Sequence, residues 1–267
     1  MKRTKFKISF VETLGKNIEN VVDSIFLNIN QTLENIEVNL NISQTLDDIG
    51  ATFNNCFLQA KPILEQFKEN LDRLPESIGD ALLIMAQHGW YLDPDLPGNY
   101  LFVISRHLER GEISEVDLFL SEYFTERIGD IENEITNKFP HRNKIISSAF
   151  NAHRREYYEL SIPILLIQID SVCQELYGQL LFRNKDRKPG TAQYVKQQKF
   201  NPYKMAFLQP LSVSTSINMT ENQREKDFTG LNRHMVLHGE SLDYGTEINS
   251  LKAISLLNYV SNILKYV

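Results

Sequence analysis

Residues 231–240, LNRHMVLHGE, place an arginine and a histidine where they could act on a phosphate ester. Arg233 and His238 are five residues apart, about 140° around an ideal helix, so they would diverge in the middle of one. Gly239 follows at once, and glycine there lets the chain leave a helix in the left-handed conformation. His238 would then lie in the last turn, where the helix dipole favours an imidazolium and the ring can turn toward Arg233.

This pair suits the cleavage of RNA. Histidine changes charge near neutral pH and can carry a proton. Arginine binds a phosphate and stabilises the charge that develops on it in the transition state. We therefore predict that His238 is the acid/base and Arg233 the phosphate-binding group, with Asn232, His234 and Glu240 supporting them or contacting RNA.

The same residues also fit a metal site. His234 and His238 are four apart and share a helix face, with Glu240 or Asp243 as a third ligand. A zinc metalloprotease needs a glutamate directly after the first histidine, and Met235 stands there, so that class is excluded. A different metal site stays open, although we expect no metal and no cofactor.

Two further alternatives make the motif non-catalytic. Arg233 could form an ion pair with Asp170 or Glu175 while His238 caps its own helix, or the domain could bind a nucleotide without cleaving it. Asp170 lies in an otherwise apolar stretch, where a polar group must find a partner or face a cleft. It could therefore orient Arg233 from a neighbouring helix, or simply lie at the surface.

A basic segment between residues 183 and 204 is interleaved with aromatic residues. Its cations are Arg183, Lys185, Arg187, Lys188, Lys196, Lys199 and Lys204, and its aromatic residues are Tyr194, Phe200 and Tyr203. Phosphate contacts combined with base stacking are typical of single-stranded RNA binding. We predict RNA contacts for Lys185, Arg187 and Lys188, against the alternative of a solvated loop.

Apolar spacing at the helical period and the near absence of strand signals predict an all-α protein. In the first half, helices are expected at about residues 57–74, 75–88, 100–110 and 114–128, with a further one ending at 138. In the second half they are expected at 141–157, 161–182, 221–238 and 246–266. Thr246 should cap the last helix. Pro163 should lie in the first turn of its helix or kink it.

The break at Phe139-Pro140 divides the chain into an N-terminal helical region, 1–139, and a second half, 140–267. A near-repeat, LNINQTLENI from Leu27 and LNISQTLDDI from Leu40, predicts two short amphipathic helices or one interrupted helix. We interpret residues 1–139 as a regulatory or partner-binding region. The sequence identifies no partner for His107.

The motif and its surroundings resemble the HEPN family (higher eukaryotes and prokaryotes nucleotide-binding), whose ribonucleases carry R-x4–6-H with a polar second residue, here His234. The resemblance covers roughly residues 139–267, including FPHRNKIISSAFNAHRREYYELSIPILLIQIDSVCQELYG and LNRHMVLHGESLDYGTEINSLKAISLLNYV. It implies a C-terminal four-helix bundle with an insertion near 183–220. It also implies a homodimer that joins two motifs in one cleft and cleaves RNA without metal through the 2′-hydroxyl.

Composition sets the limits on function. The 267 residues carry a net charge of −6, which excludes a generic polyanion binder, and two cysteines, Cys56 and Cys173, which exclude a disulfide framework or zinc cluster. We find no apolar run that would span a bilayer and no signal peptide, and expect a cytoplasmic protein.

The leading hypothesis is an HEPN-type endoribonuclease, acting as a toxin or phage-defence effector with an antitoxin or regulator bound through residues 1–139. The rival is a non-catalytic scaffold or RNA-binding module.

Overall fold

The computed structural model describes residues 42–263, apart from some side chains in residues 42–71 and that of Lys185. By its internal contacts the chain divides into two compact units, residues 1–74 and 75–267. The helices predicted from the near-repeat beginning at Leu27 therefore lie largely outside the described residues. The part of the near-repeat from Ile42 onward belongs to a helix.

The elements are nearly all helical, and the all-α prediction is confirmed. In chain order they are α2 (Ile42–Gln87), α3 (Asn99–Glu109), α4 (Ile113–Lys138), η1 (Pro140–Arg142), α5 (Asn143–Arg154), α6 (Tyr158–Tyr177), β1 (Asn184–Lys185), β2 (Lys188–Pro189), α7 (Thr191–Gln197), α8 (Pro202–Leu208), η2 (Gln209–Leu211), η3 (Glu221–Gln223), α9 (Arg233–Leu237) and α10 (Glu247–Asn262). Within residues 42–263, strand structure is limited to one antiparallel pair, β1 with β2.

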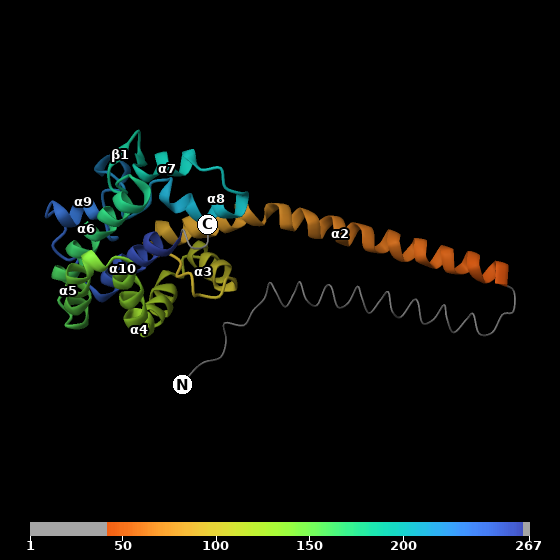
Figure 1. Ribbon diagram of the computed structural model, residues 1–267, viewed down its shortest axis with the longest axis horizontal. Coiled ribbons are helices and arrows are strands. Elements are labelled where there is room, and N and C mark those ends of the chain that lie inside the picture. Colours follow the sequence, from red (N-terminus) through yellow and green to blue (C-terminus); the bar gives the residue numbers. More distant parts are fainter. Residues whose placement is uncertain (1–41, 264–267) are drawn as a thin grey trace. The chain divides into compact units, whose positions relative to one another are not determined.

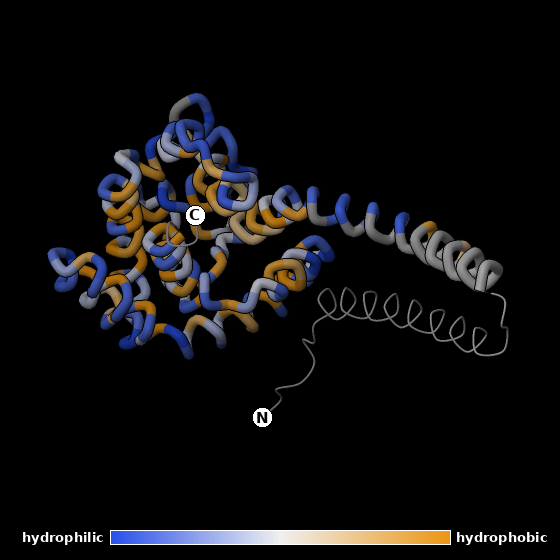
Figure 2. Tube along the Cα trace, turned by 45° about the vertical axis from the view of Figure 1, so that its right-hand side comes forward, coloured by the Kyte–Doolittle hydropathy of each residue, from blue (hydrophilic) through white to orange (hydrophobic). Residues whose placement is uncertain are grey.

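The core of the 75–267 unit is a ring of four packed helices, in which α4 contacts α5, α5 contacts α6, α6 contacts α10 and α10 contacts α4 (Figure 1). Orange and blue bands alternate along the helical tubes of Figure 2, as expected of amphipathic helices that share one apolar core. The predicted boundary after residue 139 runs between α4 and α5, which are two helices of this one bundle.

Helix α10 is buried on every side from Ser250 to Asn262 apart from the half-buried Lys252. Small and polar residues allow this, because they let neighbouring helices approach and hydrogen-bond inside. Ser255 accepts the backbone N–H of Tyr91, and the amide of Asn262 donates to Asn258. Thr246 caps the helix by accepting the N–H of Asn249, as predicted.

Three expected helix boundaries are wrong. Pro75 lies inside the continuous helix α2 rather than starting a new one, because proline already has a helical φ and removes only one hydrogen bond. The two helices expected between residues 114 and 138 are one, α4. The helix expected over 221–238 is instead η3, a loop and the five-residue α9. Pro163 lies inside α6, beyond its first turn.

No helix among residues 42–263 combines the length and apolar character needed to cross a membrane.

His153 makes the stability of this unit depend on pH. Its ring is buried beside α10 and is hydrogen-bonded to the Ser250 hydroxyl at 2.8 Å. Burial, assisted by the charge of Arg154, lowers the pKa of His153 from 6.5 to about 4. The unfolded chain therefore takes up a proton first as the pH falls, so stability is lost between about pH 6.5 and 4.

We predict that the contribution of His153 to the free energy of unfolding is about 2 kcal/mol smaller at pH 5 than at pH 7.5. Urea unfolding of the wild type and of His153→Asn at the two pH values measures it. The variant, which cannot titrate there, should show a smaller loss on acidification. Equal losses in both proteins would contradict this role for His153.

Candidate functional site

Helix α9 begins at Arg233 because Asn232 caps it. The Asn232 side-chain oxygen accepts the backbone N–H groups of His234 and Met235 at 3.0 and 3.3 Å. Its amide nitrogen donates to the carbonyls of Ser216 and Met219 at 2.8 and 3.0 Å. The residue is only 1% exposed, so Asn232 supports the motif from inside and does not face a ligand.

The helix ends at His238 by the predicted glycine mechanism. Gly239 has φ +76°, in the left-handed region. The N–H of Glu240 donates to the carbonyl of Met235 at 2.9 Å, and that of Gly239 to Val236 at 3.3 Å. These two bonds form a Schellman motif, which closes the helix and leaves the exposed His238 as its C-cap residue.

Arg233 packs against the segment that follows α6. Its guanidinium lies 5.8 Å from the centre of the Phe182 ring, and its backbone N–H donates to Ile217 at 2.9 Å. The Nε atom is buried and has no hydrogen-bond partner within residues 42–263. A guanidinium over an aromatic face keeps its charge and its donors, so it stays able to bind an anion.

The ion pairs that would make Arg233 purely structural are not found among the described residues. Glu175 contacts His141 and Arg142 instead. Asp170 accepts the backbone N–H of Phe182 at 3.0 Å. Burial raises the pKa of Asp170, while the Phe182 N–H and the nearby charge of Arg233 act in the opposite direction. Asp170 thus fixes the segment that carries Phe182, and influences Arg233 only through its charge.

The histidines form a chain of contacts on the open side of α9. The rings of His234 and His238 lie with their centres 4.3 Å apart. His234 Nε2 lies 3.1 Å from Glu240, and the other oxygen of that carboxylate accepts from Arg224 at 3.0 Å. Arg224 is only 7% exposed, so it fixes Glu240 from beneath. Glu240 can therefore orient His234, against which His238 packs.

Arg233 and His238 do not meet within one chain. The His238 ring packs on His234, whereas Arg233 packs on Phe182, and within residues 42–263 no ring contact, hydrogen bond or ion pair joins the two side chains. The expectation that the His238 ring turns toward Arg233 is therefore not met in this structure. The reason is geometric: five residues of helix separate the two side chains by most of a half turn.

The histidines of α9 do not form the alternative metal site either. Among the residues that the structure describes, one group of three His, Cys, Asp or Glu side chains converges closely enough to hold an ion. It is His107, Glu112 and Glu115, at the connection between α3 and α4. The set of His234, His238 and Glu240 or Asp243 does not converge in this way.

The basic segment forms a hairpin that neighbours the motif. β1 and β2 are joined through Asp186 and Arg187, whose φ values of 52° and 61° match a tight two-residue hairpin turn. The amide of Gln223 donates to the carbonyl of Arg187 at 3.3 Å, which ties the hairpin to the segment before α9. The side chain of Lys185 lies outside the described residues, and Arg187 and Lys188 are exposed.

A hollow of about 730 Å³ opens beside this hairpin, lined by Arg183, Lys188 and Lys196 against the single acidic residue Asp186. Arg183 lines the hollow, and the residue before it, Phe182, contacts Arg233. The chain therefore passes directly from the residue that contacts Arg233 to the first cation of this hollow.

Sequence reasoning missed two residues of the site, Arg224 and Phe182. Arg224 lies in a loop that the pattern assigned to a helix, and Phe182 looks like one more apolar residue at a helix end. Neither position carries a signal that separates it from ordinary core or surface residues. Lys252 of α10 forms an ion pair with Asp117 of α4 at 3.2 Å.

No family model, no curated protein and no solved structure matches this chain.

We predict that Asn232→Ala lowers the free energy of unfolding by about 2 kcal/mol, because it removes a helix cap and leaves buried backbone carbonyls of the 216–219 loop without their donor. Asn201→Ala is the matched control. Asn201 caps α8 by accepting the N–H of Lys204 but is exposed, so its loss should cost about 1 kcal/mol or less. Chemical denaturation measures both, and equal costs would contradict the supporting role of Asn232.

Proposed function

We propose that this protein is a metal-independent endoribonuclease of the HEPN type that acts as a homodimer. The observation that carries the proposal is the state of its two central residues. Arg233 packs on Phe182, which precedes the basic hairpin in the chain, without an ion-pair partner among the described residues, and His238 is exposed at the end of a rigidly capped helix. A purely structural motif would be expected to satisfy both residues internally.

The reaction needs a base, an acid and a cation. An imidazole of one His238 takes the proton from the RNA 2′-hydroxyl, whose oxygen attacks the adjacent phosphorus. The bond to the 5′-oxygen breaks, and that oxygen takes a proton from an imidazolium. The products are a 2′,3′-cyclic phosphate and a 5′-hydroxyl end. Arg233 binds the non-bridging oxygens and stabilises the charge of the transition state.

One chain supplies these groups in separate places. His238 and Arg233 point to different neighbours, and a single exposed His238 cannot serve as base and acid at once. A two-fold axis solves both problems, because it supplies a second copy of each group from the same sequence. Each phosphate would then contact His238 of both chains and at least one Arg233.

An exposed apolar surface near α9 is the proposed dimer face. Leu160 and Ile167 are two turns apart on α6 and are 60% and 50% exposed, while Leu242, just after the motif, is 91% exposed. The Tyr244 hydroxyl donates to the carbonyl of Glu159 at 3.1 Å, which ties the loop of Leu242 to the start of α6. Exposed apolar groups gathered in this way are typical of a protein interface.

The basic hairpin is the proposed path for the RNA strand. Although the chain as a whole is acidic, the hollow beside the hairpin is lined mainly by cations. Arg187 at the turn and Lys188 next to it are exposed and add two further cations to the hairpin. A toxin or phage-defence role follows from the family resemblance alone. An antitoxin or regulator bound through residues 1–139 completes the proposal.

We predict that the purified wild-type protein cleaves RNA in EDTA and leaves cyclic phosphate ends, and that His238→Gln and Arg233→Gln each lower the rate by at least about a hundredfold. Arg155→Gln, which changes an exposed arginine outside the site, is the control and should keep full activity. Labelled RNA of several classes, incubated with dimeric protein, measures the rate. Loss of activity only in the control, or cleavage by all proteins alike, would contradict the assignment.

We predict that Leu242→Glu and Ile167→Glu each weaken dimerisation by about tenfold or more, because a charge would be buried in the apolar interface. Leu118→Glu is the matched control, since Leu118 is 63% exposed on α4, outside the proposed face. Sedimentation velocity over a concentration series measures the dimer dissociation constant. A folded monomeric wild type, or an equal effect of Leu118→Glu, would favour the non-catalytic helical scaffold or another interface.

A further inference from the structure

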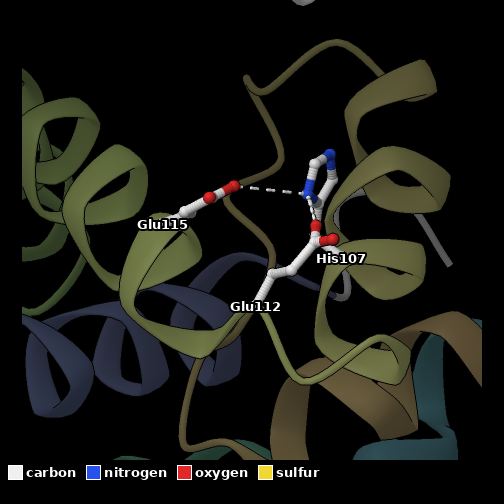
Figure 3. Close-up of side chains that lie close together, drawn as sticks. All are labelled: His107, Glu112 and Glu115. Carbon is white, nitrogen blue, oxygen red and sulfur yellow. Dashed lines mark hydrogen bonds and ion pairs between the residues drawn. The ribbon is translucent and has the colours of Figure 1, made fainter.

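The connection between α3 and α4 brings one imidazole and two carboxylates together. His107 lies in the last turn of α3, Glu112 is the residue before α4, and Glu115 is in the first turn of α4. Their ligand atoms all lie within 4.8 Å of one another, and Figure 3 shows both carboxylates directed at the same imidazole. His107, for which the sequence offered no partner, is thus the centre of a cluster.

We propose that His107, Glu112 and Glu115 bind a divalent transition-metal ion, of which Zn²⁺ is the representative. An imidazole nitrogen and two carboxylate oxygens are ligands that zinc accepts in proteins. Their combined charge of −2 is neutralised by one divalent ion. This site is separate from α9, so it does not depend on the proposed ribonuclease function.

The contacts explain why an ion fits better than a proton. His107 Nδ1 is hydrogen-bonded to Glu112, while Glu115 approaches the same nitrogen to 3.8 Å, beyond hydrogen-bond range. One proton on Nδ1 can serve only one of the two carboxylates well, and they repel each other. A metal ion has room for both and displaces the proton on binding.

The geometry needs only a small adjustment. Ligand bonds of about 2.1 Å at tetrahedral angles place ligand atoms about 3.4 Å apart. All separations in the cluster are within 4.8 Å, so none exceeds this value by more than about 1.4 Å. Glu115 is 71% exposed, so rotation of its side chain can close the difference. Water would complete the coordination on the solvent side.

The backbone beneath the cluster is rigid. Gly111 has φ +77°, and the N–H of Glu112 donates to the carbonyl of His107 at 3.0 Å. Leu108 and Val116, on the two sides of the turn, are 3% and 4% exposed and anchor both helices in the core. The turn therefore holds His107 and Glu112 together before any ion arrives, which lowers the entropy lost on binding.

The test is titration of the full-length, tag-free protein with Zn²⁺ by calorimetry, after treatment with chelator and its removal. We expect one saturable site per chain, and Glu115→Gln should weaken it at least about tenfold. This variant is informative because Glu115 is exposed and contributes little to folding. Glu109→Gln, an exposed glutamate of α3 outside the cluster, should bind like the wild type.

A second measurement identifies the nitrogen ligand. Co²⁺ added in place of Zn²⁺ should give visible d–d absorption in the wild type, and His107→Gln should abolish it, with circular dichroism confirming that the variant is folded. Equal Zn²⁺ binding by the wild type, Glu115→Gln and His107→Gln would overturn the site. So would saturable binding that His234→Gln removes, because the ion would then lie on α9.

Discussion

The burial of α10 is the constraint on which the rest of this structure depends. The helix packs on α4 and α6, and several of its polar side chains are hydrogen-bonded inside the core: Ser255 accepts the N–H of Tyr91, and Asn262 donates to Asn258. Truncating one of its buried leucines, such as Leu251 or Leu257, would leave a cavity that costs about 2–5 kcal/mol. Because α10 starts just after the loop that follows His238, its position also fixes where the motif ends.

Local capping then determines the site within this frame. A five-residue helix has almost no stability of its own, because helix nucleation is costly. α9 persists since Asn232 closes its first turn from a buried position and Gly239 closes its last turn. The two caps place Arg233 on the side of Phe182 and His238 at the open end. Capping at both ends thus fixes the positions of two residues whose side chains face different neighbours.

The acidic and basic groups near the motif have different surroundings. Two of the acidic groups considered as partners of the motif are bound to other arginines, Glu240 to Arg224 and Glu175 to Arg142. The hairpin and its hollow instead present Arg183, Lys188 and Lys196 to solvent-accessible space. An acidic protein can therefore offer a local anion-binding surface, because Coulomb interactions at the surface are screened beyond roughly 10 Å at physiological salt.

The sequence by itself determined the helical class, the Thr246 cap, the turn at Gly239 and the residues of the motif, because each depends on spacing or on backbone preferences over a few neighbours. Only the tertiary structure decided that α4 joins the bundle, that residues 224–232 are a loop, that Arg224 and Phe182 belong to the site, and that His107 meets Glu115. These features depend on which helices pack together. Apolar burial is non-directional, so the pattern along the chain does not specify those partners.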